Sequence, residues 1–412
     1  MRVPSPSVVM LTADRQIDRR ILQQAQSLRS HGWQVTLIAM PLDDSNRAQE
    51  GSEVVRVGAS QDSPAPRREN FILSVYRVLR GLVPMNGRTM RLAKRLAWRY
   101  FVDQEQFYQR LYGEAALRFT PTVFVAHDLP MLAVARQAAQ ACGARLVYDS
   151  HELYAEQEFS PFERNKWRDI ESKHIRACDA VITVNPSIAR ELEQRYRLTA
   201  PVNVIYNAAP LETQTESSRI FHEMLHLPPT ARVLLMQGGL SAGRNIETLV
   251  QAMSRVRNQD VHLVLLGDGQ LKQQMTQLAS QLKISRRVHF LSAVPQEALP
   301  SYTAGADAGS IPYLATCLNN RYCTPNKLFE YVAAQLPILA SDLPEIARIV
   351  RQFDLGLTVD FNGAESVAKG IEMFFSDPDR LDQWRHNAAV ARSQLCWEEE
   401  EEKLISIFEA FR

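Results

Sequence analysis

The feature of this sequence that most constrains its fold is a repeated alternation of short apolar runs with amphipathic segments. The first unit has an apolar run at residues 8–11, apolar residues that recur every three or four positions up to Leu28, and a second run at residues 35–39. Such alternation is typical of parallel strands joined by crossover helices. The pattern begins afresh at Val233. We therefore predict an α/β fold with two doubly wound halves.

The length and the polar stretches of the chain indicate how it divides into domains. A chain of 412 residues is longer than a single hydrophobic core usually serves. Residues 207–230 are polar, contain three prolines and show no clear strand, which is typical of a connection between domains. We expect an N-terminal domain at residues 1–206, a C-terminal domain at 207–380 and C-terminal helices at 381–412 that pack back towards the N-terminal domain.

The last predicted helix begins with five consecutive glutamates at residues 398–402. Negative charge at the start of a helix is favourable because it opposes the positive end of the helix dipole. We expect this run to be a solvated first turn, and the alternative is a binding site for a partner.

The apolar runs and the cysteines indicate where the protein works. The apolar runs are far shorter than the roughly 20 residues that cross a bilayer, and the N-terminus lacks the long apolar stretch of a secretory signal. The five cysteines are odd in number and mostly far apart, and they match neither a disulfide framework nor a metal-binding motif. We expect a cytoplasmic protein in a reducing compartment.

Positive charge is concentrated in one segment, residues 67–110, although the net charge of the whole chain is only +1. This segment has ten Arg or Lys residues against three acidic ones, interleaved with large apolar side chains. Such a basic amphipathic surface is attracted to anionic lipid, which predicts peripheral contact with the inner face of a membrane. The alternative is a pair of ordinary surface helices. Nucleic acid is a poorer fit because the overall pI is about 7.7.

Glycines and a cation follow the first predicted strand of the second half, at residues 233–236. Gly238 and Gly239 allow the backbone to approach an anion, and the next helix offers free N–H groups at its start. Arg244 adds a fixed positive charge. This segment is a candidate diphosphate site, although a Gly-Gly turn alone is a weak signal.

A second candidate anion site lies at residues 324–330, which have the sequence TPNKLFE. Its proline fits the first turn of a helix, which Asn326, Lys327 and Leu328 continue, and Glu330 lies one turn further on. A cation beside free amides suits phosphate, and a carboxylate suits ribose hydroxyls. The alternative is an ordinary helix start with a Lys–Glu surface pair.

Two pairs of histidine and acid follow neighbouring predicted strands of the first half. His127 and Asp128 follow one strand, and His151 and Glu152 follow the next. Open parallel sheets bind ligands outside the carboxyl ends of their strands, so both pairs are candidates for one wall of a cleft. A Ser-His-Asp elbow, a P-loop and a paired-cysteine motif are all missing from the sequence, which argues against hydrolase, nucleoside-triphosphatase and redox functions.

With these motifs in this order, the chain resembles family 4 of the retaining glycosyltransferases, which have the GT-B fold, and within it the subgroup with a PNKLFEY-type donor motif. The resemblance covers nearly the whole length. The segments that carry it are HDLP, YDSHEL, VITVNPSIARELEQRY, VIYNAAP, QGGLSAGRNIETLVQAM, LVLLGDGQL, TPNKLFEYVAAQLPILASDLPEI and CWEEEEEKL.

The resemblance implies a metal-independent transferase of the hexosyltransferase type, with a nucleotide-diphosphate sugar as donor and no further cofactor. It implies that Arg244 and Lys327 bind the donor diphosphate, that Glu330 binds the ribose and that His151 faces the donor sugar. Residues 288–294 would flank the base. His127 and Asp128 would lie on the side of the acceptor, which would be a glycan, a lipid-linked saccharide or a small molecule of cell-surface polysaccharide synthesis.

The sequence departs from the family pattern at several positions. Gly239 stands where many members have an arginine, which leaves Arg244 alone, and Tyr322 stands where many have a second carboxylate. Gln335 replaces a common glycine, and the first loop, residues 12–18, has no glycine. Two alternatives therefore stay open: a non-catalytic subunit of the same fold that binds a donor or a partner, and a sugar-nucleotide epimerase, which needs acid and base groups but no acceptor.

Overall fold

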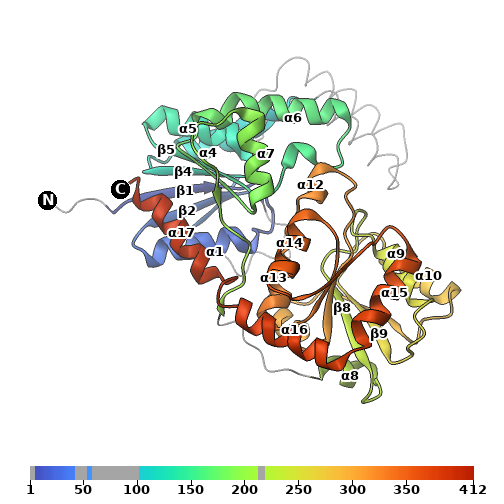
Figure 1. Ribbon diagram of the computed structural model, residues 1–412. Coiled ribbons are helices and arrows are strands. Elements are labelled where there is room, and N and C mark those ends of the chain that lie inside the picture. The colour runs from blue at the N-terminus through green and yellow to red at the C-terminus, as the bar shows by residue number, and fades with distance from the viewer. Residues whose placement is uncertain (1–4, 42–52, 58–101, 212–218) are drawn as a thin grey trace, which may run out of the picture.

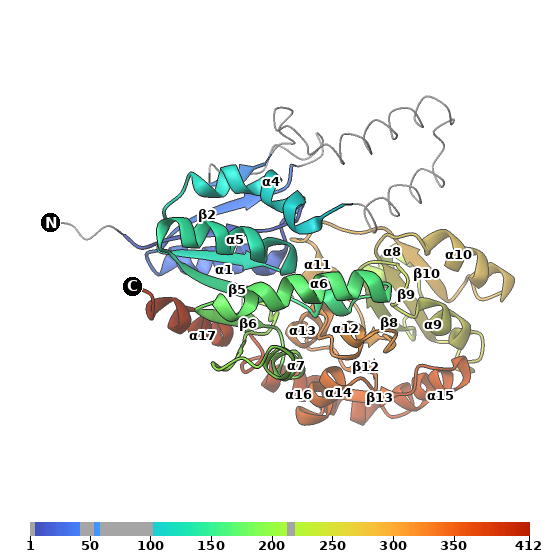
Figure 2. The same cartoon turned by 90° about the horizontal axis from the view of Figure 1, so that it is seen from above.

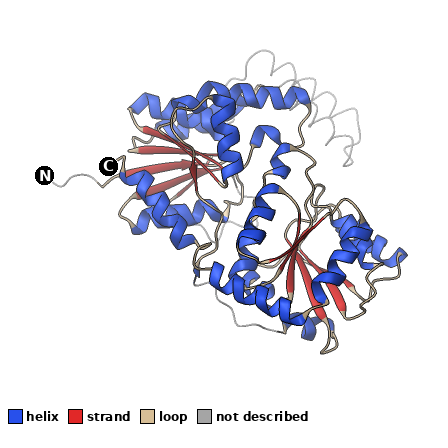
Figure 3. Cartoon of the chain, viewed as in Figure 1, coloured by secondary structure: helices blue, strands red, loops and turns tan. Residues whose placement is uncertain are grey.

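The computed structural model describes residues 5–41, 53–57, 102–211 and 219–412. These residues form two parallel sheets, each covered on both faces by helices (Figures 1 and 3). The first sheet has seven strands in the order β3-β2-β1-β4-β5-β6-β7, and the second has six in the order β10-β9-β8-β11-β12-β13. The predicted doubly wound α/β architecture is therefore confirmed.

The central strands of the N-terminal sheet are short and apolar, and most of their residues are buried on both faces, as is typical of parallel sheets. In chain order, the elements of this half are β1 (Ser7–Leu11), α1 (Arg19–Ser30), β2 (Gln34–Ala39), β3 (Val54–Arg56), α4 (Gln104–Leu117), β4 (Val123–His127), α5 (Leu129–Cys142), β5 (Arg145–Ser150), η2 (Tyr154–Glu156), α6 (Pro161–His174), η3 (Ile175–Ala177), β6 (Ala180–Thr183), α7 (Pro186–Tyr196) and β7 (Asn203–Val204).

The C-terminal sheet repeats the same winding. Its elements are α8 (Ile220–Leu225), β8 (Arg232–Gln237), α9 (Ile246–Met253), β9 (Val261–Leu266), α10 (Lys272–Gln281), β10 (Val288–Leu291), α11 (Leu299–Ala304), β11 (Ala308–Ile311), α12 (Leu318–Arg321), α13 (Asn326–Ala333), β12 (Ile338–Ser341), α14 (Pro344–Gln352), β13 (Gly356–Val359), α15 (Ala364–Phe375), α16 (Pro378–Ala391) and α17 (Trp397–Glu409).

Local sequence signals explain where several helices begin and end. The Asp18 carboxylate accepts a hydrogen bond from the Arg20 N–H and so caps α1. Ser160 and Glu163 form a reciprocal capping box at the start of α6. Gly143 ends α5 in a left-handed conformation, with a φ of 75°, that glycine adopts without strain. Two details differ from our expectations: α8 lies within the predicted linker, and Pro325 caps α13 rather than starting its first turn.

The last helix, α17, lies against α1 of the N-terminal domain (Figure 1). Trp397, Leu404 and Phe408 join the apolar cluster formed by β1 and α1, and the Trp397 indole donates to the Ser27 hydroxyl at 2.9 Å. The domain boundaries at residues 206 and 380 remain a proposal. Of the described helices, none combines the length and the apolarity that would let it cross a membrane.

The glutamates at the start of α17 are not simply a solvated turn, and this corrects our expectation. The Glu400 side chain is almost fully buried, and its carboxylate accepts a hydrogen bond from the Tyr206 backbone N–H at 2.9 Å. Glu398 accepts from the backbone N–H of Leu211. These acids accept hydrogen bonds from backbone N–H groups at the end of the N-terminal domain and in the connection that follows it. The charge pattern of one helix does not reveal such distant partners.

Removing the Glu400 carboxylate should weaken this attachment. Because Glu400→Ala leaves the Tyr206 N–H without its acceptor, we expect the free energy of unfolding to fall by about 1–3 kcal/mol in urea denaturation. Glu402→Ala is the matched control, since Glu402 is an exposed member of the same run, and it should change the value by less than about 0.5 kcal/mol. Equal stability of the two variants would contradict the structural role of Glu400.

Candidate donor-binding and catalytic site

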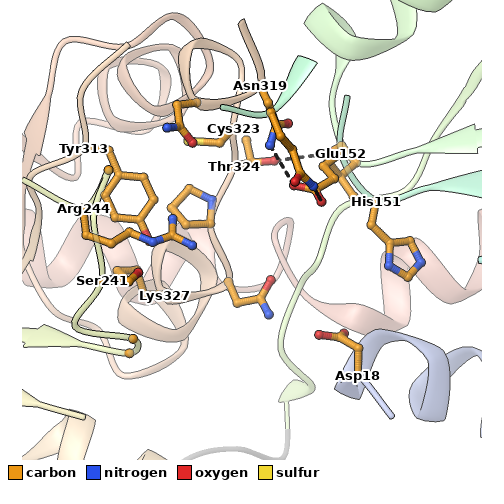
Figure 4. A pocket seen from close by; sticks show the side chains of 18 of the residues that line it. Asp18, His151, Glu152, Ser241, Arg244, Tyr313, Asn319, Cys323, Thr324 and Lys327 are labelled. Carbon is orange, nitrogen blue, oxygen red and sulfur yellow. Dashed lines mark hydrogen bonds between the residues drawn. The ribbon is translucent and has the colours of Figure 1, made fainter. Parts of the chain in front are cut away.

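A cavity of about 710 Å³ lies between the two domains, at the carboxyl ends of strands from both sheets. This is the place where open parallel sheets bind ligands. Residues after β4 and β5 line it from the N-terminal side, and residues after β8 and at the start of α13 line it from the C-terminal side. In Figure 4, Arg244 and Lys327 lie across the cavity from His151.

The structure brings most of the predicted site residues to this one cavity. Those that line it are Asp128, His151, Glu152, Gly238, Gly239, Arg244, Asn326, Lys327 and Glu330.

Two predicted site residues and one predicted segment do not line the cavity. His127 is the last residue of β4 and lies buried behind His151. The Leu328 side chain is fully buried in the core of the C-terminal domain, and its N–H donates to the Pro325 carbonyl, so Leu328 is withdrawn as a binding residue. Residues 288–294 contribute no side chain to the lining, but Leu299 at the start of α11 does.

The backbone conformation of Gly238 favours glycine. Its φ of 105° lies in a region that other residues rarely adopt. A Cβ atom at this position would lie in ordinary van der Waals contact with Lys327, 3.7 Å from Nζ. The turn after β8 therefore lies directly beside the ammonium group.

Arg244 and Lys327 contact the same aromatic ring. Cζ of Arg244 lies 4.3 Å from the centroid of the Tyr313 ring, and Nζ of Lys327 lies 5.0 Å from it. Within the described ranges, no carboxylate lies within ion-pairing distance of either cation, and neither side chain donates a hydrogen bond to a protein group. Two cations therefore face the cavity with their N–H groups available to an anion.

The pKa of Lys327 is lowered to about 7, first because the side chain is buried and second because the charge of Arg244 is close. In the free protein, this lysine is therefore a mixture of charged and neutral forms at neutral pH. An anion between the two cations would favour the charged form.

Glu330 does not pair with Lys327 as the surface-pair alternative expected. Its carboxylate accepts from Gln237 at 2.6 Å and from Arg19 at 3.2 Å. Arg19 is the first residue of α1, so this ion pair connects the two domains across the cleft. The carboxylate still lines the cavity.

His151 is held between two carboxylates. Its Nε2 lies 3.2 Å from Oδ2 of Asp149, and its Nδ1 lies 3.4 Å from Oδ2 of Asp128. Burial alone would lower the pKa of His151, but the two carboxylates outweigh it and raise the pKa to about 9. His151 is therefore an imidazolium at neutral pH, which can donate hydrogen bonds and cannot accept a proton.

Asp149 itself is fixed by side chains that sequence reasoning missed. The Arg20 guanidinium donates to both oxygens of this carboxylate, at 2.9 and 3.1 Å, and Gln24 donates at 2.7 Å. Burial would raise the pKa of Asp149, but the charge of Arg20 holds it well below its usual range. A signal was present in the sequence: Arg20 and Gln24 lie four residues apart, beside the apolar face of α1.

The side chains of His127, Asp149 and His151 are close enough to hold a metal ion, with ligand atoms within 4.8 Å of one another. The Asp149 carboxylate, however, already accepts hydrogen bonds from Arg20 and Gln24. A metal ion would lie against the Arg20 guanidinium and would have to displace these donors. The group therefore fits an ion-paired histidine network better than a metal site.

Glu152 binds the other domain. Its carboxylate accepts from the Asn319 amide at 2.7 Å and from Gln157, and the Asn319 carbonyl oxygen accepts from the Leu153 N–H at 3.0 Å. Asn319 belongs to α12, which contacts η2 and lies on the side of the C-terminal domain that faces the N-terminal domain (Figures 1 and 2). Near it, Tyr322 packs against the core of the N-terminal domain. These contacts determine how the two walls of the cavity face each other.

Known proteins share this architecture over almost the whole chain. The sucrose-phosphate synthase of Thermosynechococcus elongatus superposes with a TM-score of 0.75 at 17% identity and 98% coverage of both chains. Anabaena HepE in complex with UDP-glucose superposes with a TM-score of 0.70 at 15% identity, covering 98% of this chain and 100% of that one. The predicted GT-B fold is confirmed by these structures.

A sequence relative is the N-acetylgalactosamine-N,N'-diacetylbacillosaminyl-diphospho-undecaprenol 4-alpha-N-acetylgalactosaminyltransferase of Campylobacter jejuni. It is 23% identical over 224 residues, which make up 53% of this chain and 56% of the relative. The match thus spans little more than half the length of that protein.

The pKa of Lys327 predicts a measurable proton uptake. Because this lysine is mostly neutral at pH 8 and a bound diphosphate favours its ammonium form, a nucleoside diphosphate should bind with uptake of close to one proton. Its affinity should then weaken as the pH rises above about 7, by up to tenfold per pH unit. Calorimetry at pH 8 in buffers of different ionisation enthalpy measures the uptake, and Lys327→Arg should abolish it. Binding without proton uptake in the unmodified protein would contradict the assignment.

Two family descriptions cover the two halves of the chain in order. Residues 17–208 match the glycosyl transferase 4-like domain, and residues 218–390 match glycosyl transferases group 1. The two matches meet in the interdomain connection, and the cavity lies between the domains that they describe. This chain therefore belongs to the group 1 glycosyltransferases of family 4.

Proposed function

We propose that this protein transfers a sugar of the hexose type from a nucleotide-diphosphate sugar to a glycan or lipid-linked acceptor, with retention of configuration at the anomeric carbon. The observation that carries the proposal is the pair of cations, Arg244 and Lys327, on the cavity wall opposite His151, for which the described part of the chain supplies no carboxylate partner. The PNKLFEY segment that supplies Lys327 supports the donor-motif subgroup proposed from the sequence.

In this reaction the site would have to stabilise the charges that develop in the transition state. As the bond between the anomeric carbon and the phosphate oxygen breaks, negative charge grows on the diphosphate and positive charge grows on the sugar ring. Arg244, Lys327 and the N-terminus of α13 would stabilise the departing diphosphate. Cations held without carboxylate partners suit this task because they need no rearrangement when charge develops.

His151 would orient the donor sugar rather than remove a proton. As an imidazolium it has no free base site, and its Nδ1–H, which faces Asp128 at 3.4 Å, would be shared with a sugar hydroxyl. The acceptor oxygen would attack from the face that the diphosphate leaves. Its proton would pass to the departing phosphate oxygen as the new carbon–oxygen bond forms, so the scheme requires no metal ion.

Glu330 would bind the ribose hydroxyls, which would then share its carboxylate with Arg19 and Gln237. The UDP-glucose in the Anabaena HepE structure makes UDP-sugars the first donors to test. The name of the Campylobacter jejuni relative supports a lipid-linked acceptor. The predicted membrane contact through residues 67–110 falls mostly outside the described residues.

The two alternatives are separable by product analysis. An epimerase converts the nucleotide sugar without an acceptor, and a non-catalytic subunit releases neither nucleotide nor product. A transferase releases nucleoside diphosphate in proportion to the glycosylated acceptor. Incubation of UDP-sugars with and without saccharide acceptors distinguishes all three.

Loss of either cation should reduce catalysis strongly. Removing one such electrostatic partner typically costs about 10²- to 10³-fold in rate, so we expect Arg244→Ala and Lys327→Ala each to lower kcat/KM for the donor by that factor. Arg286→Ala, which removes an exposed arginine of the same domain, is the control and should retain full activity. Full transfer by the Arg244 and Lys327 variants would rule out this diphosphate site.

A further inference from the structure

Tyr313 occupies an unusual position in the cavity. It follows β11, its side chain is 3% exposed, and it lines the cavity beside both cations. Figure 4 shows its ring alongside Arg244, with Lys327 on the same wall. The motifs found in the sequence do not include this residue.

Two cations this close to one ring, without a carboxylate partner among the described residues, repel each other. The effect is visible in Lys327, whose pKa falls through burial and the neighbouring charge of Arg244. The face of an aromatic ring carries partial negative charge, which attracts cations within about 6 Å of the centroid. Both cations satisfy this distance, at 4.3 and 5.0 Å.

An aromatic ring, unlike a carboxylate, can attract the two cations without accepting hydrogen bonds from their N–H groups. A carboxylate would accept hydrogen bonds from Arg244 or Lys327 and would compete with a bound diphosphate. A ring attracts the charge through its face and leaves the N–H groups of both side chains free. Within the part of the chain that the structure describes, the Tyr313 hydroxyl forms no hydrogen bond, and burial raises its pKa, so the phenol stays neutral.

We propose that Tyr313 is a positioning residue of the diphosphate site, whose ring holds Arg244 and Lys327 side by side with their N–H groups free for the phosphate oxygens. The inference rests on the proposed function and deepens it by assigning the arrangement of the two cations to one ring. The role belongs to the ring and not to the hydroxyl group, so a phenylalanine should fulfil it.

The test uses inorganic pyrophosphate, a probe that lacks both base and sugar. Its dissociation constant is measured by calorimetry at one pH for the unmodified protein, Tyr313→Phe and Tyr313→Leu. Tyr313→Phe should bind within about twofold, and Tyr313→Leu roughly tenfold more weakly, because two cation–π contacts are lost while an apolar side chain of moderate size remains. Thermal unfolding of each variant shows whether the fold is kept. In the transfer reaction, Tyr313→Leu should raise the KM for the donor more than it lowers kcat.

A second series separates the ring's charge from its shape and covers the case in which Tyr313→Leu does not fold. Phenylalanines with increasing numbers of fluorine atoms at position 313 keep the ring but withdraw charge from its face, so pyrophosphate affinity should fall step by step. Equal affinity along the series, or in Tyr313→Leu, would overturn the role of Tyr313 alone. If the unmodified protein binds neither pyrophosphate nor UDP, the proposed donor site fails and the inference with it.

Discussion

The functional site depends on two neighbouring cations, the buried Lys327 and the partly buried Arg244, for which the described residues offer no carboxylate partner. Burying a charge is unfavourable unless a partner compensates it. Burial and the charge of Arg244 lower the pKa of Lys327 to about 7. The face of the Tyr313 ring compensates part of the unfavourable burial. Other parts of this wall lie close to the same two cations: Gly238 lies beside Lys327, and Asn326 at the start of α13 lines the cavity. An anionic ligand completes a site that the protein alone leaves incomplete.

On the opposite wall, the buried charges are paired with charges of opposite sign. Asp149 is buried, but Arg20 and Gln24 bind its oxygens, and together with Asp128 it keeps His151 protonated. The two walls meet through the Arg19–Glu330 ion pair and through Asn319 of α12. The wall with Arg244 and Lys327 can therefore bind negative charge, and the opposite wall holds the protonated His151 in a fixed position. This arrangement suits the transfer of a sugar away from a diphosphate.

The sequence was sufficient for the fold because its main signal is local. The apolar runs at residues 8–11, 35–39 and 233–236 lie within the observed strands β1, β2 and β8. Site residues that follow strands, such as Arg244 and His151, could also be predicted from the sequence, because parallel sheets bind ligands at the carboxyl ends of their strands.

Contacts between distant segments could not be predicted from local sequence patterns. Arg20 binds Asp149, which lies 129 positions away in the sequence. The role of Tyr313 becomes clear only from the structure, which places both cations beside its ring. Leu328 was misassigned because neighbours along a helix point in different directions: Lys327 lines the cavity, whereas the Leu328 side chain is buried in the core. Glu400 was assigned to solvent because the backbone N–H that it binds belongs to Tyr206, which is far away in the sequence.

The most direct test of the central claim is a crystal structure of the protein with bound UDP. The account predicts that the diphosphate lies between the two cations, with its oxygens at about 2.7–3.2 Å from the Arg244 guanidinium and from Nζ of Lys327. A UDP molecule whose phosphates lie away from both side chains would contradict it.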